Sequence, residues 1–460
     1  MNLMEENVLV YGLGATGIAT ARFLAGEGAM VLAVDDRPQS ELREVEAALE
    51  QINVDVRGGF AGSSLPREIS LVIPSPGVPP SNQLLHEADA KGIDVISEIE
   101  LASRFIQAPI IAVTGTNGKT TTTEFIAHVL REWGKRIFVG GNIGNPLVNC
   151  AKRDNDIDFL VVEVSSFQLE RIRRFHPRAA VLLNLGSDHL DYHGSLDAYH
   201  AAKGRVFENM KAGDLAVLNA DDPYSAELAL SIEADILYFS AKRRLERGIF
   251  ADGERLIVKT SAGDEEVFPG GSVRLVGRHN LENIMAGIAI VRYFGCPESL
   301  LQEGLATFVG LPHRMEHVAT RRNVTYYNDS KGTNVDAVNA ALESCEQPVV
   351  LLMGGRDKGE NFGRLADSIR RKVRTLVLFG EAAPVIGNAL GGLVPTTMKR
   401  TLGEAVDEAL ASARRGDTVL LSPGCSSFDE FRDYRERGEF FRDRVLSAAA
   451  SSKTPMREES

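Results

Sequence analysis

The chain has 460 residues, of which 44% are hydrophobic and 25% charged, and 51 basic against 63 acidic residues give a net charge of −12. This composition is typical of a globular protein of about three domains, at roughly 150 residues each, and excludes a largely disordered chain. An acidic chain without a basic block is not expected to bind nucleic acid. All apolar runs are shorter than the roughly 18–20 residues of a membrane-spanning helix, so no membrane insertion is expected.

Strands and helices are expected to alternate along almost the whole chain, because short apolar runs alternate with helical patterns. This alternation predicts an α/β fold in which helices cover parallel sheets. The pattern falls into three blocks, which we interpret as domains at residues 1–107, 108–311 and 312–460. Residues 448–460 are small and polar, and we expect them to form a frayed tail.

The central block contains one exception to this alternation. Between residues 248 and 276, short alternating strands with glycine-containing turns predict a small antiparallel annex, and a helix is expected at 280–294. The remaining strands are expected at residues 8–11, 30–34, 71–74, 110–113, 159–164, 180–184, 215–219, 324–327, 349–353, 375–379 and 418–422.

The first motif is the segment 12–17, Gly-Leu-Gly-Ala-Thr-Gly, which follows a predicted strand and opens a helix. Asp35 follows at the end of the next predicted strand. This pattern matches a dinucleotide fingerprint, but the same turn can bind any nucleotide diphosphate or simply pack a helix on a strand.

A second glycine-rich turn lies between the strand at 110–113 and a helix that begins near Thr121. It ends in Gly118-Lys119-Thr120, although Val113 replaces the first glycine of the strict phosphate-loop pattern. The backbone N–H groups of such a turn bind phosphate oxygens, the lysine reaches the β- and γ-phosphates, and the hydroxyl can bind Mg²⁺. We therefore expect ATP to bind here.

Candidate metal ligands follow neighbouring strands. Glu163 ends one strand, and a carboxylate in that position often holds Mg²⁺ beside the loop threonine. His189 follows another strand, although an isolated histidine there is commonly structural. Lys203, judged from its own surroundings, reads as a solvated helix residue.

Three loops of the third block follow three predicted strands, at residues 328–334, 354–359 and 422–428. Such loops converge beyond the carboxyl ends of parallel strands, where ligands bind. Their two lysines and several hydroxyls suit an anionic substrate with carboxylates. The alternative is that they serve only as turns and helix caps.

The order of the motifs along the chain resembles that of the Mur ligases, cytoplasmic ATP-dependent enzymes of peptidoglycan precursor synthesis. The resemblance covers roughly residues 8–445, and the three C-terminal loops are similar to those of its D-glutamate-adding branch. The Asp-Asn-Pro-Arg motif of the diaminopimelate-adding branch is absent. The motifs are 114–120 (Thr-Gly-Thr-Asn-Gly-Lys-Thr), 141–144 (Gly-Asn-Ile-Gly), 163–170 (Glu-Val-Ser-Ser-Phe-Gln-Leu-Glu), Asp188-His189, 277–280 (Gly-Arg-His-Asn) and 312–314 (Pro-His-Arg).

The resemblance implies a Rossmann-like first domain, a central P-loop-type ATP-binding domain and a Rossmann-like C-terminal domain. It further implies a cytoplasmic monomer whose three substrates are UDP-N-acetylmuramoyl-L-alanine, D-glutamate and ATP. ATP would convert the alanyl carboxylate into an acyl phosphate, which the amine of D-glutamate then attacks. Two Mg²⁺ ions would assist, and Lys203 would be carbamylated.

The resemblance also implies a role for individual residues. Catalysis would involve Lys119, His189 and Lys203, and the metal ligands would be Thr120, Glu163, His189 and Lys203. ATP would contact Gly115, Thr116, Asn117, Gly118, Lys119, Thr120, Thr121, Asn280, Arg314 and Asp329. The UDP-sugar would contact Gly14, Ala15, Thr16, Asp36, Arg37, Ser75, Gly77, Asn142 and Ser165, and D-glutamate would contact Lys331, Thr333, Lys358, Ser427 and Tyr434.

Three alternatives to this function remain open at the level of sequence. One is another ligase of the same fold, such as a folylpolyglutamate synthase, in which the first block would have no evident role. The second is an NAD-dependent oxidoreductase that uses the turn at 12–17. The third is a nucleotide-binding regulatory protein without turnover.

Overall fold

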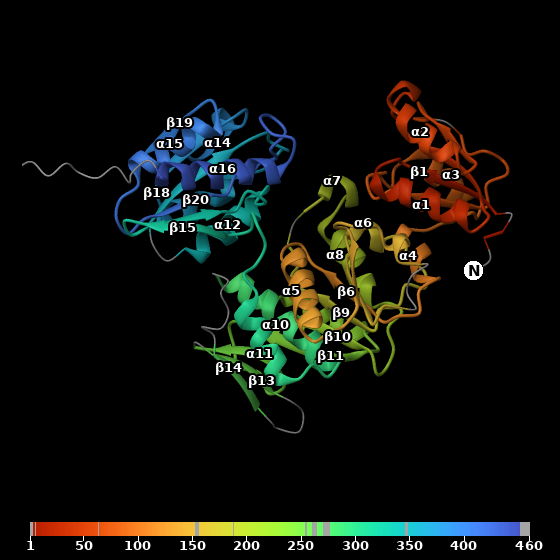
Figure 1. Ribbon diagram of the computed structural model, residues 1–460, viewed down its shortest axis with the longest axis horizontal. Helices are drawn as coiled ribbons and strands as arrows, with labels where there is room; N and C mark the ends of the chain where they lie inside the picture. Colours follow the sequence, from red (N-terminus) through yellow and green to blue (C-terminus); the bar gives the residue numbers. More distant parts are fainter. Residues whose placement is uncertain are drawn as a thin grey trace, which may run out of the picture. The chain divides into compact units, whose positions relative to one another are not determined.

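The computed structural model describes residues 3–4, 6–62, 64–151, 156–186, 188–253, 255–259, 265–269, 277–345 and 348–450. The described chain forms three sheets in two compact units (Figure 1). The first unit comprises Met1–Ser272 and Glu282–Thr307, and the second comprises Val273–Leu281 and Phe308–Ser460. The predicted α/β fold is confirmed.

The first sheet is entirely parallel and has the strand order β3-β2-β1-β4-β5. The loops after β1 and β4 therefore leave the sheet in different directions, which makes this edge a binding position. The strands are β1 (Asn7–Tyr11), β2 (Met30–Val34), β3 (Val54–Arg57), β4 (Leu71–Pro74) and β5 (Asp94–Val95), and the helices are α1 (Ala15–Gly26), η1 (Gln39–Glu41), α2 (Arg43–Glu50), α3 (Gln83–Ala90) and α4 (Glu98–Ser103).

The central sheet has nine strands in the order β14-β13-β12-β11-β10-β9-β6-β8-β7. Its strands β6 (Ile110–Thr114) and β8 (Phe159–Glu163) are buried along their whole length, as expected for parallel strands covered on both faces. The other strands are β7 (Ile137–Gly141), β9 (Ala179–Leu182), β10 (Leu215–Asn219), β11 (Asp235–Ser240), β12 (Gly248–Asp252), β13 (Arg255–Lys259) and β14 (Glu265–Pro269).

The predicted antiparallel annex is present as β12, β13 and β14. It continues the central sheet rather than standing apart, because β12 pairs in parallel with β11. Residues 254, 260–264 and 270–276 of this prediction lie outside the described residues. The helices of this part are α5 (Lys119–Glu132), η2 (Leu147–Asn149), α6 (Ser166–Leu169), α7 (Leu190–His193), α8 (Leu196–Gly204), η4 (Arg205–Phe207), α9 (Pro223–Leu228), η5 (Ala229–Ser231), α10 (Arg278–Tyr293) and α11 (Glu298–Thr307).

The third sheet has the order β15-β16-β20-β17-β18-β19, in which only β15 runs antiparallel among the described strands. The helix α16 (Tyr434–Ala450) continues three residues into the segment predicted to fray, and residues 451–460 lie outside the described chain. The strands are β15 (Glu316–Arg321), β16 (Val324–Asn328), β17 (Val349–Gly354), β18 (Val373–Phe379), β19 (Thr396–Met398) and β20 (Thr418–Leu421), and the other helices are α12 (Val335–Ser344), η7 (Phe362–Leu365), α13 (Ala366–Lys372), α14 (Ala383–Leu390) and α15 (Leu402–Ser412).

None of the helices within the described ranges is both long enough and apolar enough to cross a membrane.

Candidate active site

The turn between β6 and α5 has the geometry of a phosphate-binding loop. Gly118 is the N-cap of α5 with φ of +88°, and a Cβ there would lie 2.1 Å from the side-chain oxygen of Asn283. The loop is also fixed by Asn184, whose side-chain oxygen accepts a hydrogen bond from the N–H of Asn117 at 2.9 Å. Glycine is therefore required at this position, where the turn leads into the N-terminus of α5, the helix end that favours an anion. Asn283 was not predicted from the sequence.

The two predicted catalytic lysines, Lys119 and Lys203, meet at this turn. The Nζ of Lys119 donates to the carbonyls of Gly115 and Thr116, at 2.9 and 2.8 Å, and the Nζ of Lys203 donates to the same Gly115 carbonyl at 2.9 Å. Lys203 is only 2% exposed and lies 4.8 Å from the ring of Tyr199. Judged from its neighbours in the sequence alone, Lys203 was interpreted as a solvated helix residue, and this interpretation is wrong.

Burial governs the protonation of Lys203. Desolvation first, and then the charge of Lys119, lowers the pKa of Lys203 well below its ordinary value, and Asp188 and Glu163 oppose this shift. A lysine with a lowered pKa supplies the neutral amine that reacts as a nucleophile.

Glu163, at the end of β8, completes this group. One of its carboxylate oxygens accepts a hydrogen bond from the Thr120 hydroxyl and the other from the Asn142 amide, each at 2.8 Å. The hydroxyl and carboxylate are hard oxygen donors of the kind that Mg²⁺ prefers. Among the described residues, no three His, Cys, Asp or Glu side chains form a metal-binding cluster. A Mg²⁺ ion held by one or two carboxylates and substrate phosphates does not require such a cluster.

His189 lies just before α7, in the left-handed region with φ of +51°. Its side chain is about half exposed, and its ring lies 4.7 Å from that of Phe167. The neighbouring His193 is instead fully buried between Glu170 and Ser166, each at 2.9 Å. His189 is therefore the histidine that remains accessible, while His193 is structural.

Ser165 has a structural task in addition to the predicted contact with the UDP-sugar. It is the N-cap of α6, and its hydroxyl and N–H form a capping box with Gln168.

The turn between β1 and α1 packs closely on one side, at Gly12 and Gly17, and is exposed on the other, at Gly14 and Ala15. Gly17 packs on the turn so closely that a Cβ would lie 1.8 Å from the Gly12 carbonyl, which also accepts a hydrogen bond from Ser75 at 2.8 Å. Gly14 and Ala15 are exposed at the start of α1, and Gly77 is exposed after β4. This leaves the helix N-terminus open to a diphosphate.

Asp35 directly follows β2, and its carboxylate is hydrogen-bonded by other residues of the same domain. Its carboxylate accepts hydrogen bonds from the N–H of Leu13 at 2.7 Å and from the Arg37 guanidinium at 2.9 Å. These bonds, with that of Arg37 the strongest, lower the pKa of Asp35 to about 2. In an NAD site this carboxylate binds the ribose. Its internal bonds therefore disfavour the oxidoreductase alternative.

The three C-terminal loops converge as predicted, because they follow the adjacent strands β16, β20 and β17. The N–H of Gly424 donates to the carbonyl of Gly332 at 2.8 Å, and Arg356 and Ser426 exchange backbone hydrogen bonds at 2.9 and 3.0 Å. The loops that were expected to line a crevice therefore bind one another directly.

The predicted D-glutamate residues differ in exposure. The Nζ of Lys331 lies 4.0 Å from the ring centroid of Tyr434, whereas Lys358 is exposed on its loop. Ser427 is buried and Thr333 is half-buried. The structure therefore brings Lys331 and Tyr434 together.

Two of the ATP-binding residues predicted in the second unit, Asp329 and Asn280, are buried. Asp329 is buried next to the Ser422 hydroxyl, which donates to it at 2.7 Å, and burial raises the pKa of Asp329 to about 7. Asn280 is buried in the first turn of α10. Arg314 directly follows the buried His313.

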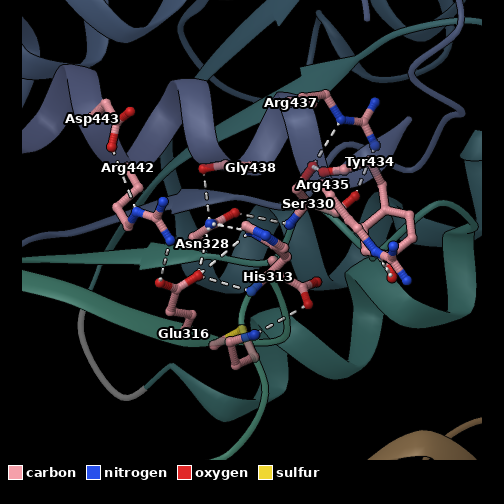
Figure 2. Close-up of polar contacts among 12 residues, drawn as sticks. His313, Glu316, Asn328, Ser330, Tyr434, Arg435, Arg437, Gly438, Arg442 and Asp443 are labelled. Atoms are coloured by element: carbon pink, nitrogen blue, oxygen red, sulfur yellow. Dashed lines mark hydrogen bonds and ion pairs between the residues drawn. The ribbon is translucent and has the colours of Figure 1, made fainter. Parts of the chain in front are cut away.

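Arg437 connects these loops and was not predicted. Its guanidinium is fully buried and donates to the Ser330 hydroxyl at 3.0 Å and the Ser330 carbonyl at 2.8 Å (Figure 2). It also donates to the carbonyls of Cys425 and Ser426, each at 3.1 Å. Burial lowers the pKa of Arg437 to about 10. A signal did exist in the sequence, since Arg437, Phe441 and Val445 follow the i, i+4, i+8 spacing of one buried helix face.

His313 and Asn328 form a second connection to α16. The Asn328 amide nitrogen lies 2.9 Å from Nδ1 of His313, 2.9 Å from the Glu316 carboxylate and 3.0 Å from the carbonyl of Gly438 (Figure 2). A Cβ on Gly438 would lie 2.2 Å from the His313 ring. This network fixes the segment that carries Arg314.

The whole chain matches known proteins. Residues 6–97 match the Mur ligase MurD-like N-terminal domain, residues 113–291 the Mur ligase middle domain and residues 313–425 the Mur ligase glutamate ligase domain. The UDP-N-acetylmuramoylalanine--D-glutamate ligase of Syntrophus aciditrophicus is 45% identical over 98% of this chain and 99% of its own length. That of Pelobacter propionicus is 46% identical over 95% of this chain and 98% of its own length.

Solved structures share the fold. The MurF ligase of Thermotoga maritima, solved in complex with ADP, has a TM-score of 0.61, with 17% identity, 97% of this chain covered and 96% of its own. The UDP-N-acetylmuramate-alanine ligase MurC of the same organism has a TM-score of 0.57, with 21% identity, 97% of this chain covered and 100% of its own. Matching domains, near-complete coverage by relatives and a common fold together establish that this chain belongs to the Mur ligase family.

Proposed function

We propose that this chain is an ATP-dependent, ADP-forming ligase that joins D-glutamate to UDP-N-acetylmuramoyl-L-alanine in peptidoglycan precursor synthesis. The observation that carries this proposal is the meeting of Lys119 and the buried Lys203 at one phosphate-binding turn, with Thr120 and Glu163 beside it. Near-complete similarity to D-glutamate ligases supports the choice of amino acid.

The three domains divide the substrates among them in this proposal. Residues 1–107 bind the UDP-sugar at the turn after β1, residues 108–311 bind ATP, and residues 312–460 bind D-glutamate in the crevice of the three loops. The contacting residues are those implied by the family resemblance. A crevice with Lys331 and Lys358 provides cations for the two carboxylates of D-glutamate.

The first chemical step brings together two anions, the alanyl carboxylate and the γ-phosphate of ATP. Attack of the carboxylate on the phosphorus forms an acyl phosphate and releases ADP, and attack of the D-glutamate amine on the acyl carbon then releases phosphate. Lys119 neutralises charge on the transferred phosphoryl group. Orientation of the substrates alone contributes on the order of 7–11 kcal/mol.

The residues of the central turn fit Mg²⁺. One ion would be held by Thr120 and Glu163, whose oxygens already lie 2.8 Å apart, and a second by His189 and a carbamylated Lys203. Bound Mg²⁺ supplies charge neutralisation at the phosphate oxygens.

Carbamylation of Lys203 follows from its burial. The neutral amine adds to the carbon of CO₂, and one proton is released to give an anionic carbamate. This exchanges a cation that would repel the metal for an oxygen donor that Mg²⁺ prefers.

ATP and sugar nucleotides are cytoplasmic substrates, so we place the enzyme in the cytoplasm, and we propose that it acts as a monomer. The test is an ADP-release assay with UDP-N-acetylmuramoyl-L-alanine across a panel of amino acids. We expect turnover with D-glutamate and none with L-glutamate, because the crevice fixes both carboxylates and directs the amine. ADP release that does not depend on D-glutamate would overturn the proposal.

Substitution of the crevice residues tests the assignment of that crevice. Thr333→Ala and Lys358→Ala should raise KM for D-glutamate, with little change in KM for ATP. If the variants lost affinity for ATP alone, the crevice would be assigned wrongly.

A further inference from the structure

Two buried glutamates, Glu98 and Glu100, lie on the short helix α4, where they are 2% and 0% exposed. Glu100 is fully hydrogen-bonded. One of its carboxylate oxygens accepts the backbone N–H groups of residues 173–175 at 2.8 to 2.9 Å, and the other accepts from the Arg104 guanidinium at 2.8 Å. Glu100 therefore anchors α4 to the segment that follows α6.

Glu98 is only half satisfied by comparison. Its Oε1 accepts a hydrogen bond from the N–H of Val148 at 2.7 Å, whereas its Oε2 and the hydroxyl of Ser97 are buried without a hydrogen-bond partner in the described part of the chain. Burial raises the pKa of Glu98 to about 7, although the backbone N–H groups of Val148 and Leu147 oppose this shift. An unpaired oxygen in the interior costs stability, so packing alone does not account for an acid at this position.

The one partner of Glu98 shows what the acid does for the backbone. Val148 is the second residue of η2, and the first N–H groups of a helix have no acceptor within the helix itself. The N-cap of η2 is Pro146, whose side chain carries no oxygen that could accept them. The carboxylate from α4 takes the place of a local cap and fixes the start of η2.

The loop before η2 is bound directly to Glu163. Pro146 separates η2 from Asn145, whose carbonyl accepts a hydrogen bond from the N–H of Gly141 at 2.8 Å. Asn142 binds Glu163 twice, because its N–H donates to the Glu163 carbonyl and its side-chain amide donates to Oε1, each at 2.8 Å. A Cβ on Gly141 would lie 2.4 Å from the Glu163 carbonyl, so the loop lies tightly against the end of β8.

We propose that Glu98 is a positioning residue for the magnesium site, because its cap on η2 holds Asn142 in the place from which Asn142 orients the Glu163 carboxylate. The inference rests on the proposed Mg²⁺ position at Thr120 and Glu163. Hydrogen-bond partners fix the orientation of metal-binding carboxylates, and losing such a partner typically costs roughly 10- to 100-fold in metal affinity or activity. Loss of the cap therefore weakens the response to Mg²⁺ while the contacts of the nucleotide itself remain.

Binding of ADP to the full-length protein, measured by isothermal titration calorimetry with Mg²⁺ and with EDTA, tests this proposal. The ratio of the two affinities reports the contribution of the metal. Glu98→Met keeps the approximate length of the side chain and removes the acceptor, so it should reduce this ratio by about tenfold and leave the affinity in EDTA unchanged. Glu98→Gln keeps an acceptor oxygen and should retain most of the ratio.

The matched control is Glu100→Gln, which disturbs the other buried carboxylate of the same helix, away from the loop of Asn142. It should lower Tm and leave the ratio unchanged. Equal decreases of the ratio in Glu98→Met and Glu100→Gln would indicate a general loosening of α4 and would overturn the proposal, as would an unchanged ratio in folded Glu98→Met. If Glu98→Met does not fold, Glu98→Asp, which withdraws the carboxylate by one methylene, should reduce the ratio several-fold, and an unchanged ratio there would be equally decisive.

A double-mutant cycle tests the route through Asn142. Asn142→Ala should itself reduce the ratio, and adding Glu98→Met should then have no further effect, whereas additive losses would overturn the route. A wild type whose affinity for ADP does not respond to Mg²⁺ would overturn the proposed metal position and this inference with it. Failure of the proposed function is separately visible in the wild type, as ADP release that does not depend on D-glutamate.

Discussion

The two glycine turns of the first unit have the same backbone plan and different electrostatics. In each, a buried parallel strand leads through glycines into a helix whose N-terminus faces outward. At the turn before α1, the nearest acid, Asp35, is neutralised by Arg37. At the turn before α5, Lys119 and Lys203 both donate to the Gly115 carbonyl.

In the proposed function, this difference separates a turn that holds a diphosphate from a turn at which a phosphoryl group is transferred. A diphosphate that does not react needs only backbone N–H groups and a neutral surrounding. A phosphoryl group in transfer spreads charge over its oxygens, and cations placed before the reaction stabilise that charge. The shared turn thus supplies the geometry, and its neighbours decide the chemistry.

The largest effect is expected from removing Lys119. Lys119→Ala should reduce turnover by about 10³-fold, because it removes the cation on the transferred phosphoryl group. UDP binding at the first turn should be unchanged, which calorimetry on the same preparation measures. Near-normal ADP release by a folded variant would remove the central turn from the mechanism.

Lys203→Ala should reduce turnover by about 100-fold, since the second metal position would lose its oxygen donor. Acetate or formate should partly restore activity by filling the vacated space, and bicarbonate should not. In the wild type, ¹³C-bicarbonate should give a carbamate signal by NMR that the variant lacks. Full activity of the variant without bicarbonate would contradict this role.

At the first turn, Arg37→Ala should raise KM for the UDP-sugar by about tenfold, because it exposes the charge of Asp35 to the diphosphate. KM for ATP should not change. Arg57→Ala is the matched control, since Arg57 pairs with the exposed Asp55 in the same sheet. Equal effects of the two variants would contradict a specific role for Arg37.

The smallest effect concerns acid stability. Because the pKa of Asp35 lies at about 2, below its ordinary value of 3.8, its contribution to stability is present above about pH 4 and is lost between pH 4 and 2. Arg37→Ala should remove about 1 kcal/mol of this contribution, discounted for the exposure of Arg37. Hydrogen exchange of β1 and β2, corrected for intrinsic rates, measures it. An unchanged pH dependence would contradict the ion pair's role.

The sequence predicted strands best where they form distinct apolar runs. The strands β2, β4 and β10 have the bounds expected from their apolar runs. The strand β7 was missed, because most of it is half exposed and it ends in two glycines. The short strands β5 and β19 were also missed, since two or three residues carry no periodicity.

In the candidate site too, the sequence predicted best what a local pattern encodes. Local motifs predicted the turn with Lys119 and Thr120, because its residues are consecutive. Asn283 supports that turn from α10, and no local pattern connects the two segments. Glu163 was predicted as a metal ligand from its place at the end of a strand, whereas the roles of His189 and Lys203 came from the family resemblance, since contacts between distant segments are set by the fold.

The buried Arg437 has a consequence for the timing of synthesis. Ser330 and Arg437 are separated by 107 residues, so the loop after β16 leaves the ribosome long before the arginine that fixes it. The first sheet and both glycine turns can close earlier, since their segments lie nearer the N-terminus. A nascent chain therefore fixes the loops proposed to bind the amino acid last, and a protein released before α16 would carry both glycine turns without these loops in place.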